Sequence, residues 1–167
     1  MILHPVDTIL SLVLLSVLFS FGSSRLPGLI KVIAFQGIIV SIVPFFIGHD
    51  MTAGGVVFTV ATLLIRGIII PMSIYVAIKK VAIKREVEPI IGFHASMLCG
   101  LGLIVAATYI SRQLNIPFIS NYTLLFPTAI ALLATGMFLL IARRNAIAMV
   151  LGYIMMENGI YLIGTTI

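Results

Sequence analysis

Charged side chains are scarce in this sequence. They account for 9% of its 167 residues, whereas about a quarter of an ordinary soluble domain is charged. Hydrophobic residues reach 61% and the mean hydropathy is +1.26, which is more apolar surface than a soluble core can bury. The composition therefore predicts a protein whose solvent is the lipid bilayer.

Residues that hold metals and cofactors are also sparse. Cys99 is the one cysteine, which excludes an internal disulfide and an iron–sulfur cluster held by this chain alone. The three histidines lie in different segments without ligand spacing, and the sequence has no glycine-rich phosphate loop, nucleophile elbow or HExxH motif. We expect no metal, no cofactor and no catalysis by this chain alone.

Six apolar segments follow one another between polar or Gly/Pro breaks: 6–22, 28–48, 54–78, 90–110, 122–142 and 146–167. Their continuous apolarity predicts helices and excludes a β-barrel, whose strands alternate at period two. The expected fold is all-α, a single polytopic bundle of about six transmembrane helices over residues 1–167. A signal peptide ending near Gly22 is the alternative for the first segment, but no Lys or Arg precedes Arg25.

The basic residues predict the orientation of the bundle. The net charge of +5 is not a nucleic-acid patch, because these residues are spread over short connections between apolar segments. Arg112 alone is basic near the even-numbered connections, whereas eight basic residues lie near the odd-numbered ones: Arg25, Lys31, Lys79, Lys80, Lys84, Arg85, Arg143 and Arg144. The positive-inside rule therefore places the odd-numbered connections in the cytoplasm and both termini outside, in a bacterial or archaeal cytoplasmic membrane.

The longest hydrophilic stretch is the connection 79–89. We interpret it as a solvated loop near anionic lipid, with contact to a cytoplasmic partner as the alternative.

Two charged residues fall at the middle of apolar segments. Arg66 is the midpoint of 54–78, and Glu157 lies at the midpoint of 146–167. Each such residue costs about 2.5–3.5 kcal/mol on insertion scales, so we expect both to face protein or a wet cavity. Pro71 leaves the Gly67 carbonyl without its helical donor, which predicts a kink beside the cation.

Polar groups accompany Glu157 along its helix. Tyr153 and Tyr161 lie four residues before and after it on the same face, and Asn158 follows it directly. We interpret these residues as support for a proton site, although aromatic residues at helical spacing are often simple packing. His94 is either a relay from the cytoplasmic loop or a satisfied interfacial histidine. Small residues on a separate face suit close helix packing: Ala148, Gly152 and Gly159.

The sequence leaves the partner of Arg66 open. Its candidates are Glu157, backbone carbonyls and a carboxylate of a neighbouring subunit. An ion pair would hold Glu157 ionised, whereas desolvation drives an unpaired carboxylate at this depth to take up a proton, which it can then exchange.

Residues 133–167 resemble a known family. The motifs are Ala142-Arg143-Arg144-Asn145, then Met149, Gly152 and the run Met155-Met156-Glu157-Asn158-Gly159-Ile160. They are similar to the E membrane component of energy-converting nickel–iron hydrogenases of the formate-hydrogenlyase type. More distantly, they resemble the K subunit of NADH:quinone oxidoreductase and the C subunit of multisubunit sodium/proton antiporters. The first four segments agree with the E component in number and hydrophobicity only.

The sequence also departs from this family. In K-type subunits the acid of this helix falls where this chain has Ile154, one turn before Glu157, and residues at i and i+3 share a face, so the role could survive the shift. Those relatives continue into another span with a second acid. Either the sequence is shortened after Ile167 or a partner supplies that carboxylate.

The resemblance implies antiporter-like and quinone-reductase-like membrane subunits beside this chain, and a hydrogenase or related redox module on the cytoplasmic side. The hypothesis is a subunit whose proton pathway runs through Glu157, with Arg66 tuning its field. The alternatives are a non-conducting scaffold subunit of the same complex, a subunit of a cation/proton antiporter, and an independent transporter. The absence of a duplicated half disfavours the last of these.

Overall fold

The computed structural model describes residues 5–23, 25–47, 53–80, 92–114 and 122–165. Helices make up nearly all of these residues, in the order α1 (Pro5–Gly22), α2 (Leu26–Ile47), α3 (Ala53–Leu64), η1 (Ile65–Ile69), α4 (Ile70–Lys80), α5 (Phe93–Gln113), α6 (Leu125–Ala142) and α7 (Ala146–Gly164). Because α3, η1 and α4 are continuous, the described residues contain six helices long and apolar enough to cross a membrane. The predicted all-α fold with six spans is confirmed.

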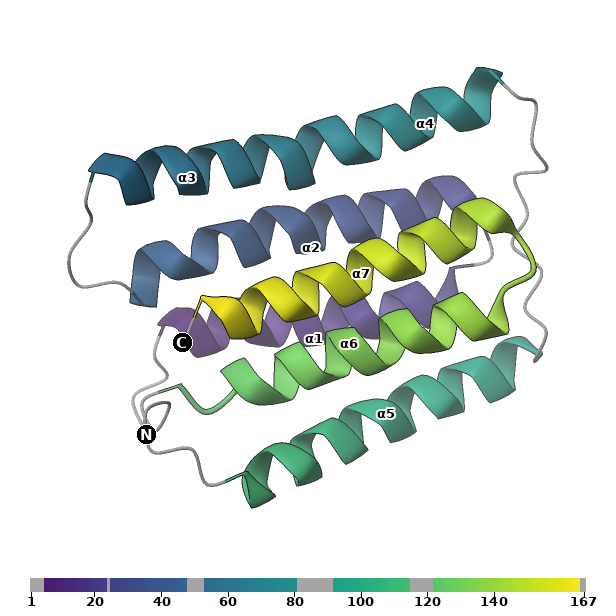
Figure 1. Ribbon diagram of the computed structural model, residues 1–167. Coiled ribbons are helices and arrows are strands. Elements are labelled where there is room, and N and C mark those ends of the chain that lie inside the picture. Colours follow the sequence, from purple (N-terminus) through teal and green to yellow (C-terminus); the bar gives the residue numbers. More distant parts are fainter. Residues whose placement is uncertain (1–4, 24, 48–52, 81–91, 115–121, 166–167) are drawn as a thin grey trace.

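The helices pack as a bundle in which successive spans run antiparallel (Figure 1). The α3–η1–α4 element lies at one edge and packs against α2, while α5 lies at the opposite edge against α1 and α6. Between the edges, α7 packs against both α2 and α6, and α1 contacts α2 and α6. The fold therefore places α7 beside α2, the helix on which the element that carries Arg66 packs.

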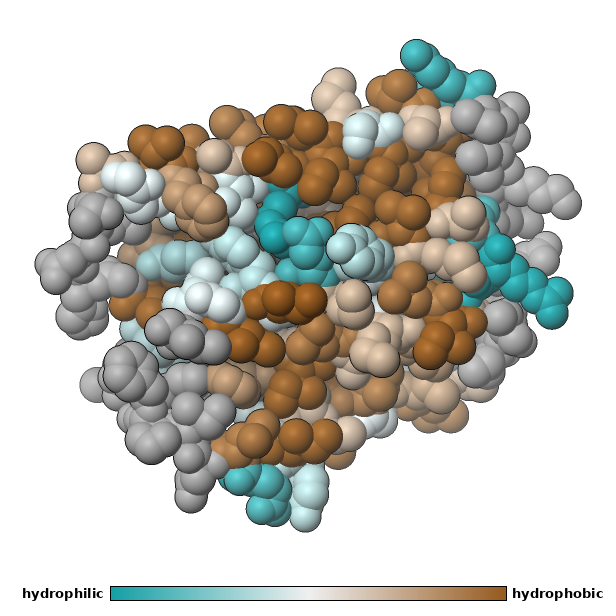
Figure 2. All heavy atoms as spheres, in the orientation of Figure 1, coloured by the Kyte–Doolittle hydropathy of each residue, from teal (hydrophilic) through white to brown (hydrophobic). Residues whose placement is uncertain are grey.

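The hydrophobic core lies among the four middle helices. Large side chains of each are fully buried there, such as Leu10 of α1, Ile33 of α2, Leu132 of α6 and Met155 of α7. The two edge elements bury little of their surface and expose large apolar side chains instead. Figure 2 shows this face of the molecule as mostly brown, hydrophobic surface. Exposing this much apolar surface to water is unfavourable, so the surface suits contact with lipid or with other membrane helices.

Basic residues gather at one end of the bundle. Arg25 stands between α1 and α2, Lys79 and Lys80 end α4, and Arg143 and Arg144 stand between α6 and α7. Because the helices alternate in direction, these three positions share one end (Figure 1). Arg112 lies in the last turn of α5, at the other end. Lys84, Arg85 and most of the 79–89 connection lie outside the described residues, and the side of the membrane that each end faces stays a prediction.

Candidate functional site

Arg66 lies in a local irregularity of the third span. The π-helical turn η1 covers Ile65–Ile69, and the N–H of Ile70 closes it by donating to the Ile65 carbonyl. Pro71, the second residue of α4, has no N–H to donate to a carbonyl of the preceding turn. A regular α-helix would lose a hydrogen bond there, and the helix instead widens into a π-helical turn. The sequence predicts a kink beside Arg66, and the structure has a π-helical turn at this position.

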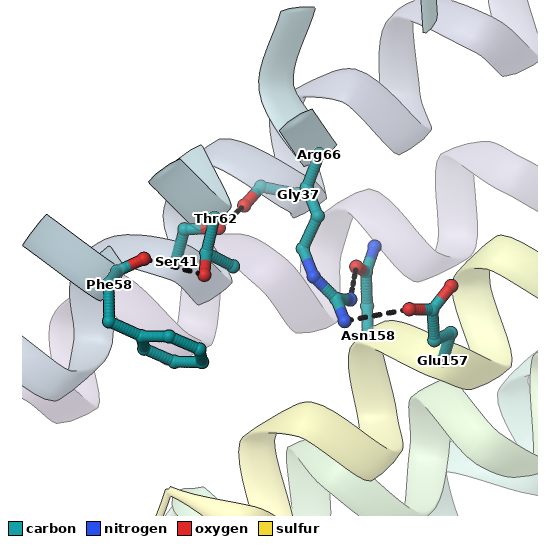
Figure 3. Close-up of polar contacts among 7 residues, drawn as sticks. All are labelled: Gly37, Ser41, Phe58, Thr62, Arg66, Glu157 and Asn158. Carbon is teal, nitrogen blue, oxygen red and sulfur yellow. Dashed lines mark hydrogen bonds and ion pairs between the residues drawn. The ribbon is translucent and has the colours of Figure 1, made fainter. Parts of the chain in front are cut away.

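A glycine of α2 lets this turn come close to the bundle. A Cβ built at Gly37 would lie 2.9 Å from the carbonyl oxygen of Arg66 and 3.3 Å from its Cβ, so the two main chains are in contact. One turn later, the Ser41 hydroxyl donates to the Gly37 carbonyl at 2.7 Å (Figure 3). This contact fixes the position from which the Arg66 side chain reaches into the molecule.

The other half of the site is set by the start and packing of α7. Asn145 caps the helix by accepting a hydrogen bond from the N–H of Ile147 at 2.9 Å. Added Cβ atoms at Gly152 and Gly159 would lie 2.9 and 2.8 Å from backbone oxygens of α6. The predicted small-residue face therefore makes a close contact with α6, and Glu157 is turned away from that contact.

Arg66 reaches across to α7 and contacts three of its side chains. Its Nη2 donates to Glu157 Oε1 at 2.8 Å, and its Nη1 donates to Asn158 Oδ1 at 2.9 Å. The guanidinium carbon also lies 4.6 Å from the centre of the Tyr161 ring, in a cation–π contact. Figure 3 shows the arginine side chain extending from η1 towards Glu157 and Asn158. The open question of the sequence is answered: Arg66 pairs with Glu157.

The two charges are buried to different degrees. The side chain of Arg66 is 12% exposed, whereas that of Glu157 is 39% exposed. In Figure 2 teal, hydrophilic atoms lie near the middle of the face, with brown, apolar surface above and below them. The ion pair thus cancels two opposite charges at mid-span, and the carboxylate remains reachable from the outer face of α7.

A second set of polar groups lies deeper, between α1 and α2. Gln36 is fully buried and its Nε2 donates to the Ser16 hydroxyl at 2.9 Å. Gln36 Oε1 and Asn158 Nδ2 are buried without a hydrogen-bond partner among the described residues. Buried groups of this kind are normally satisfied by internal water.

Two residues predicted for the site lie apart from this cluster. Tyr153 is 53% exposed on the outer face of α7, and it is not among the residues that Arg66 contacts. His94 is exposed in the first turn of α5, which packs against α1 and α6 on the far side of the bundle from η1. Neither residue joins the cluster, which consists of Arg66, Glu157, Asn158 and Tyr161. No three His, Cys, Asp or Glu side chains come together as a possible metal site in the part of the chain that the structure describes.

Arg143 is a feature that the sequence reasoning missed. Charge counting treats it like Arg144, yet Arg143 is 2% exposed and Arg144 lies on the surface. It directly follows α6, where the helix carbonyls favour a cation. Burial lowers the pKa of its guanidinium, although an arginine keeps its charge in proteins. Arg143 therefore takes part in the packing of the α6–α7 connection, and the sequence offers no signal that separates it from Arg144.

Comparison with known proteins gives one informative similarity. This chain is 27% identical over 153 residues to the uncharacterized protein Rv0085 of Mycobacterium tuberculosis, a match that covers 89% of this chain and 68% of the relative. No family model and no solved structure matches the chain. The similarity extends over most of the bundle, but the relative's name assigns no activity. Function must therefore be argued from the site.

Proposed function

We propose that this chain is a hydrophobic subunit of a redox-driven, ion-translocating membrane complex, and that Glu157 is its intramembrane proton site. The observation that carries the proposal is the ion pair at mid-span, in which a carboxylate 39% exposed lies 2.8 Å from a nearly buried guanidinium. The pair holds Glu157 ionised at rest, so the proposal requires that a charge moving nearby weaken this hold before the carboxylate takes up a proton. Here one partner is held and the other is reachable, which suits a group that changes its charge.

The contacts of Arg66 permit that change of charge. When Glu157 takes up a proton, its attraction for the guanidinium falls, and Arg66 needs other partners at this depth. Asn158 Oδ1 still accepts from Nη1, and the Tyr161 ring still faces the cation. The arginine is thus held by two neutral groups whatever the state of Glu157. When the carboxylate is protonated, the guanidinium loses its counter-charge but keeps its contacts with Asn158 and Tyr161.

The exposed side of Glu157 indicates where protons come from. Contact between a carboxylate and lipid hydrocarbon is energetically unfavourable, so the outer face of α7 requires another subunit or a water-filled passage beside Glu157. Internal water next to Asn158 and Gln36 would extend this passage into the bundle. In this proposal the proton is exchanged between a neighbouring subunit and Glu157, and the positive charge of Arg66 sets when it is released.

The identity of the partners rests on the resemblance of residues 133–167. The Arg-Arg-Asn run and the Met-rich helix with Glu157 support antiporter-like and quinone-reductase-like membrane subunits, with a cytoplasmic hydrogenase or related redox module. The orientation that goes with this arrangement is cytoplasmic for the basic end of the bundle and external for both termini.

A scaffold role is the second candidate, and one observation favours it. The α3–η1–α4 element packs chiefly against α2, so the contacts of Arg66 with α7 are an additional tie that holds this edge in place. A scaffold role requires the contacts of Arg66 with α7 but does not require proton exchange at Glu157.

The variant Glu157→Gln separates the two roles. The amide keeps an oxygen that accepts from Arg66 but cannot take up a proton reversibly. In the detergent-extracted complex returned to sealed vesicles, we expect the proton-pathway subunit to assemble normally and to lose coupled proton transport. Loss of assembly, or normal transport, would favour the scaffold. Tyr153→Phe, a change on the same helix outside the cluster, is the matched control.

A further inference from the structure

A groove of about 290 Å³ opens on the outer surface of α1 and α2, away from the ion pair. Its lining is almost entirely apolar: Leu12, Leu15, Ser16, Phe19, Lys31, Val32 and Phe35. The Ser16 hydroxyl is already used, because it donates to the Val13 carbonyl at 2.6 Å and accepts from Gln36. The body of the groove therefore offers nothing to a polar ligand and suits a hydrocarbon chain.

Lys31 gives the groove a polar end. It lies five residues after the start of α2, about 7.5 Å along the helix, and its side chain is exposed. Its flexible stem can carry the ammonium back to the depth of lipid headgroups. Phe19, three residues before the end of α1, stands at the same end, whereas Asp7, the acidic residue of α1, lies at the other end of that helix. The groove thus runs from a cation near the membrane surface to apolar side chains near mid-span.

We propose that this groove binds one acyl chain of an anionic phospholipid, with the lipid phosphate on Lys31. Charge complementarity selects an anionic headgroup, because one basic side chain near the surface attracts such lipids measurably. A groove of about 290 Å³ is too small to hold a transmembrane helix, which is about 10 Å across, and suits part of a single acyl chain. The proposal does not depend on the role of Glu157.

Because this sequence has no tryptophan, a single introduced tryptophan can report on the groove by its fluorescence. Phe19→Trp places one fluorophore in the groove, and its emission is quenched when a brominated acyl chain lies against it. Phe58→Trp is a matched control, because Phe58 of α3 is 63% exposed and Phe19 is 61% exposed, but Phe58 lies outside the groove. Both variants are reconstituted with any co-purifying partners, and emission from the parental preparation is subtracted.

At position 19 we expect dibrominated phosphatidylglycerol to half-quench at a mole fraction about fivefold lower than dibrominated phosphatidylcholine, the ratio expected for one basic contact. At position 58, and at position 19 in the Lys31→Gln background, we expect the two lipids to quench alike. Equal quenching at position 19 with Lys31 present would overturn the proposal in favour of ordinary boundary lipid. Absence of quenching by either lipid there would also overturn it, since protein would then cover the groove. Phe35→Trp repeats the measurement from α2 if Phe19→Trp does not fold.

Discussion

Gly37 of α2 and Arg66 of η1 meet main chain to main chain, since a Cβ built at Gly37 would lie 2.9 Å from the Arg66 carbonyl oxygen. The contact carries the backbone of Arg66 close to α2, and the long side chain then passes on to α7. The geometry of the ion pair therefore depends on a residue that touches neither charge. A glycine here is required for close approach and not for an unusual backbone angle.

We predict that Gly37→Ala destabilises the protein and disturbs the ion pair. The added methyl meets backbone, which cannot move aside without shifting η1, and overpacking of this kind costs about 1–3 kcal/mol. Unfolding in detergent measures the loss. Gly102→Ala on α5 is the control, because nothing lies within 4 Å of a Cβ there. Equal stability of the two variants would contradict the close contact.

The pairing of Arg66 with Glu157 predicts strong coupling in a double-mutant cycle. Glu157→Ala or Arg66→Ala alone leaves one charge without its partner, and the double variant removes both. We expect an interaction free energy of about 1.5–3 kcal/mol, as for hydrogen bonds to charged groups. Tyr153→Phe should change the free energy of unfolding by less than about 0.5 kcal/mol. Additive single effects would show that the two side chains do not interact.

Asp7 provides a prediction at the opposite end of the bundle from the basic residues. It is buried, and its Oδ1 accepts from the Leu124 N–H at 3.0 Å, at the start of α6. We expect Asp7→Ala to cost about 0.5–2 kcal/mol, because a helix N-terminus loses an acceptor. Asp7→Asn keeps an acceptor and should cost less. Thermal unfolding distinguishes the two, and identical losses would mean that the hydrogen bond is unimportant.

The orientation of the bundle can be tested with described residues at its two ends. In a Cys99→Ser background, a cysteine at Arg112 should react with an impermeant thiol reagent added to intact cells. A cysteine at Lys80 should react only after the membrane is opened, because the positive-inside rule places that end in the cytoplasm. The opposite pattern would reverse the proposed topology.

The spans could be predicted from sequence because each is a continuous apolar run, and lipid leaves few alternatives for such a run. The partner of Arg66 could not, because Glu157 is 91 residues away and backbone carbonyls or a second subunit were equally available acceptors. Nor does the sequence show that α5 lies on the far side of the bundle, which removes His94 from the site.

Tyr153 and Tyr161 are equally spaced from Glu157 along α7 but lie in different environments. Successive residues turn by about 100°, so Tyr153 and Tyr161 stand about 40° to either side of Glu157. That difference is enough to bring Tyr161 against Arg66 and to leave Tyr153 exposed. Ile154, where K-type subunits have their acid, is buried, while Glu157 is reachable from outside. A shared face therefore did not ensure a shared environment.

Infrared difference spectroscopy of the proposed complex tests the central claim most directly, by following the carboxyl group of Glu157 during turnover. The account predicts an ionised carboxylate at rest, paired with Arg66, and a protonated carboxyl C=O band that appears when the redox module is driven. That band should be absent from Glu157→Gln preparations, in which the complex remains assembled. Continued proton translocation without any such band, in the unaltered complex, would contradict the account and leave Glu157 as a structural tie.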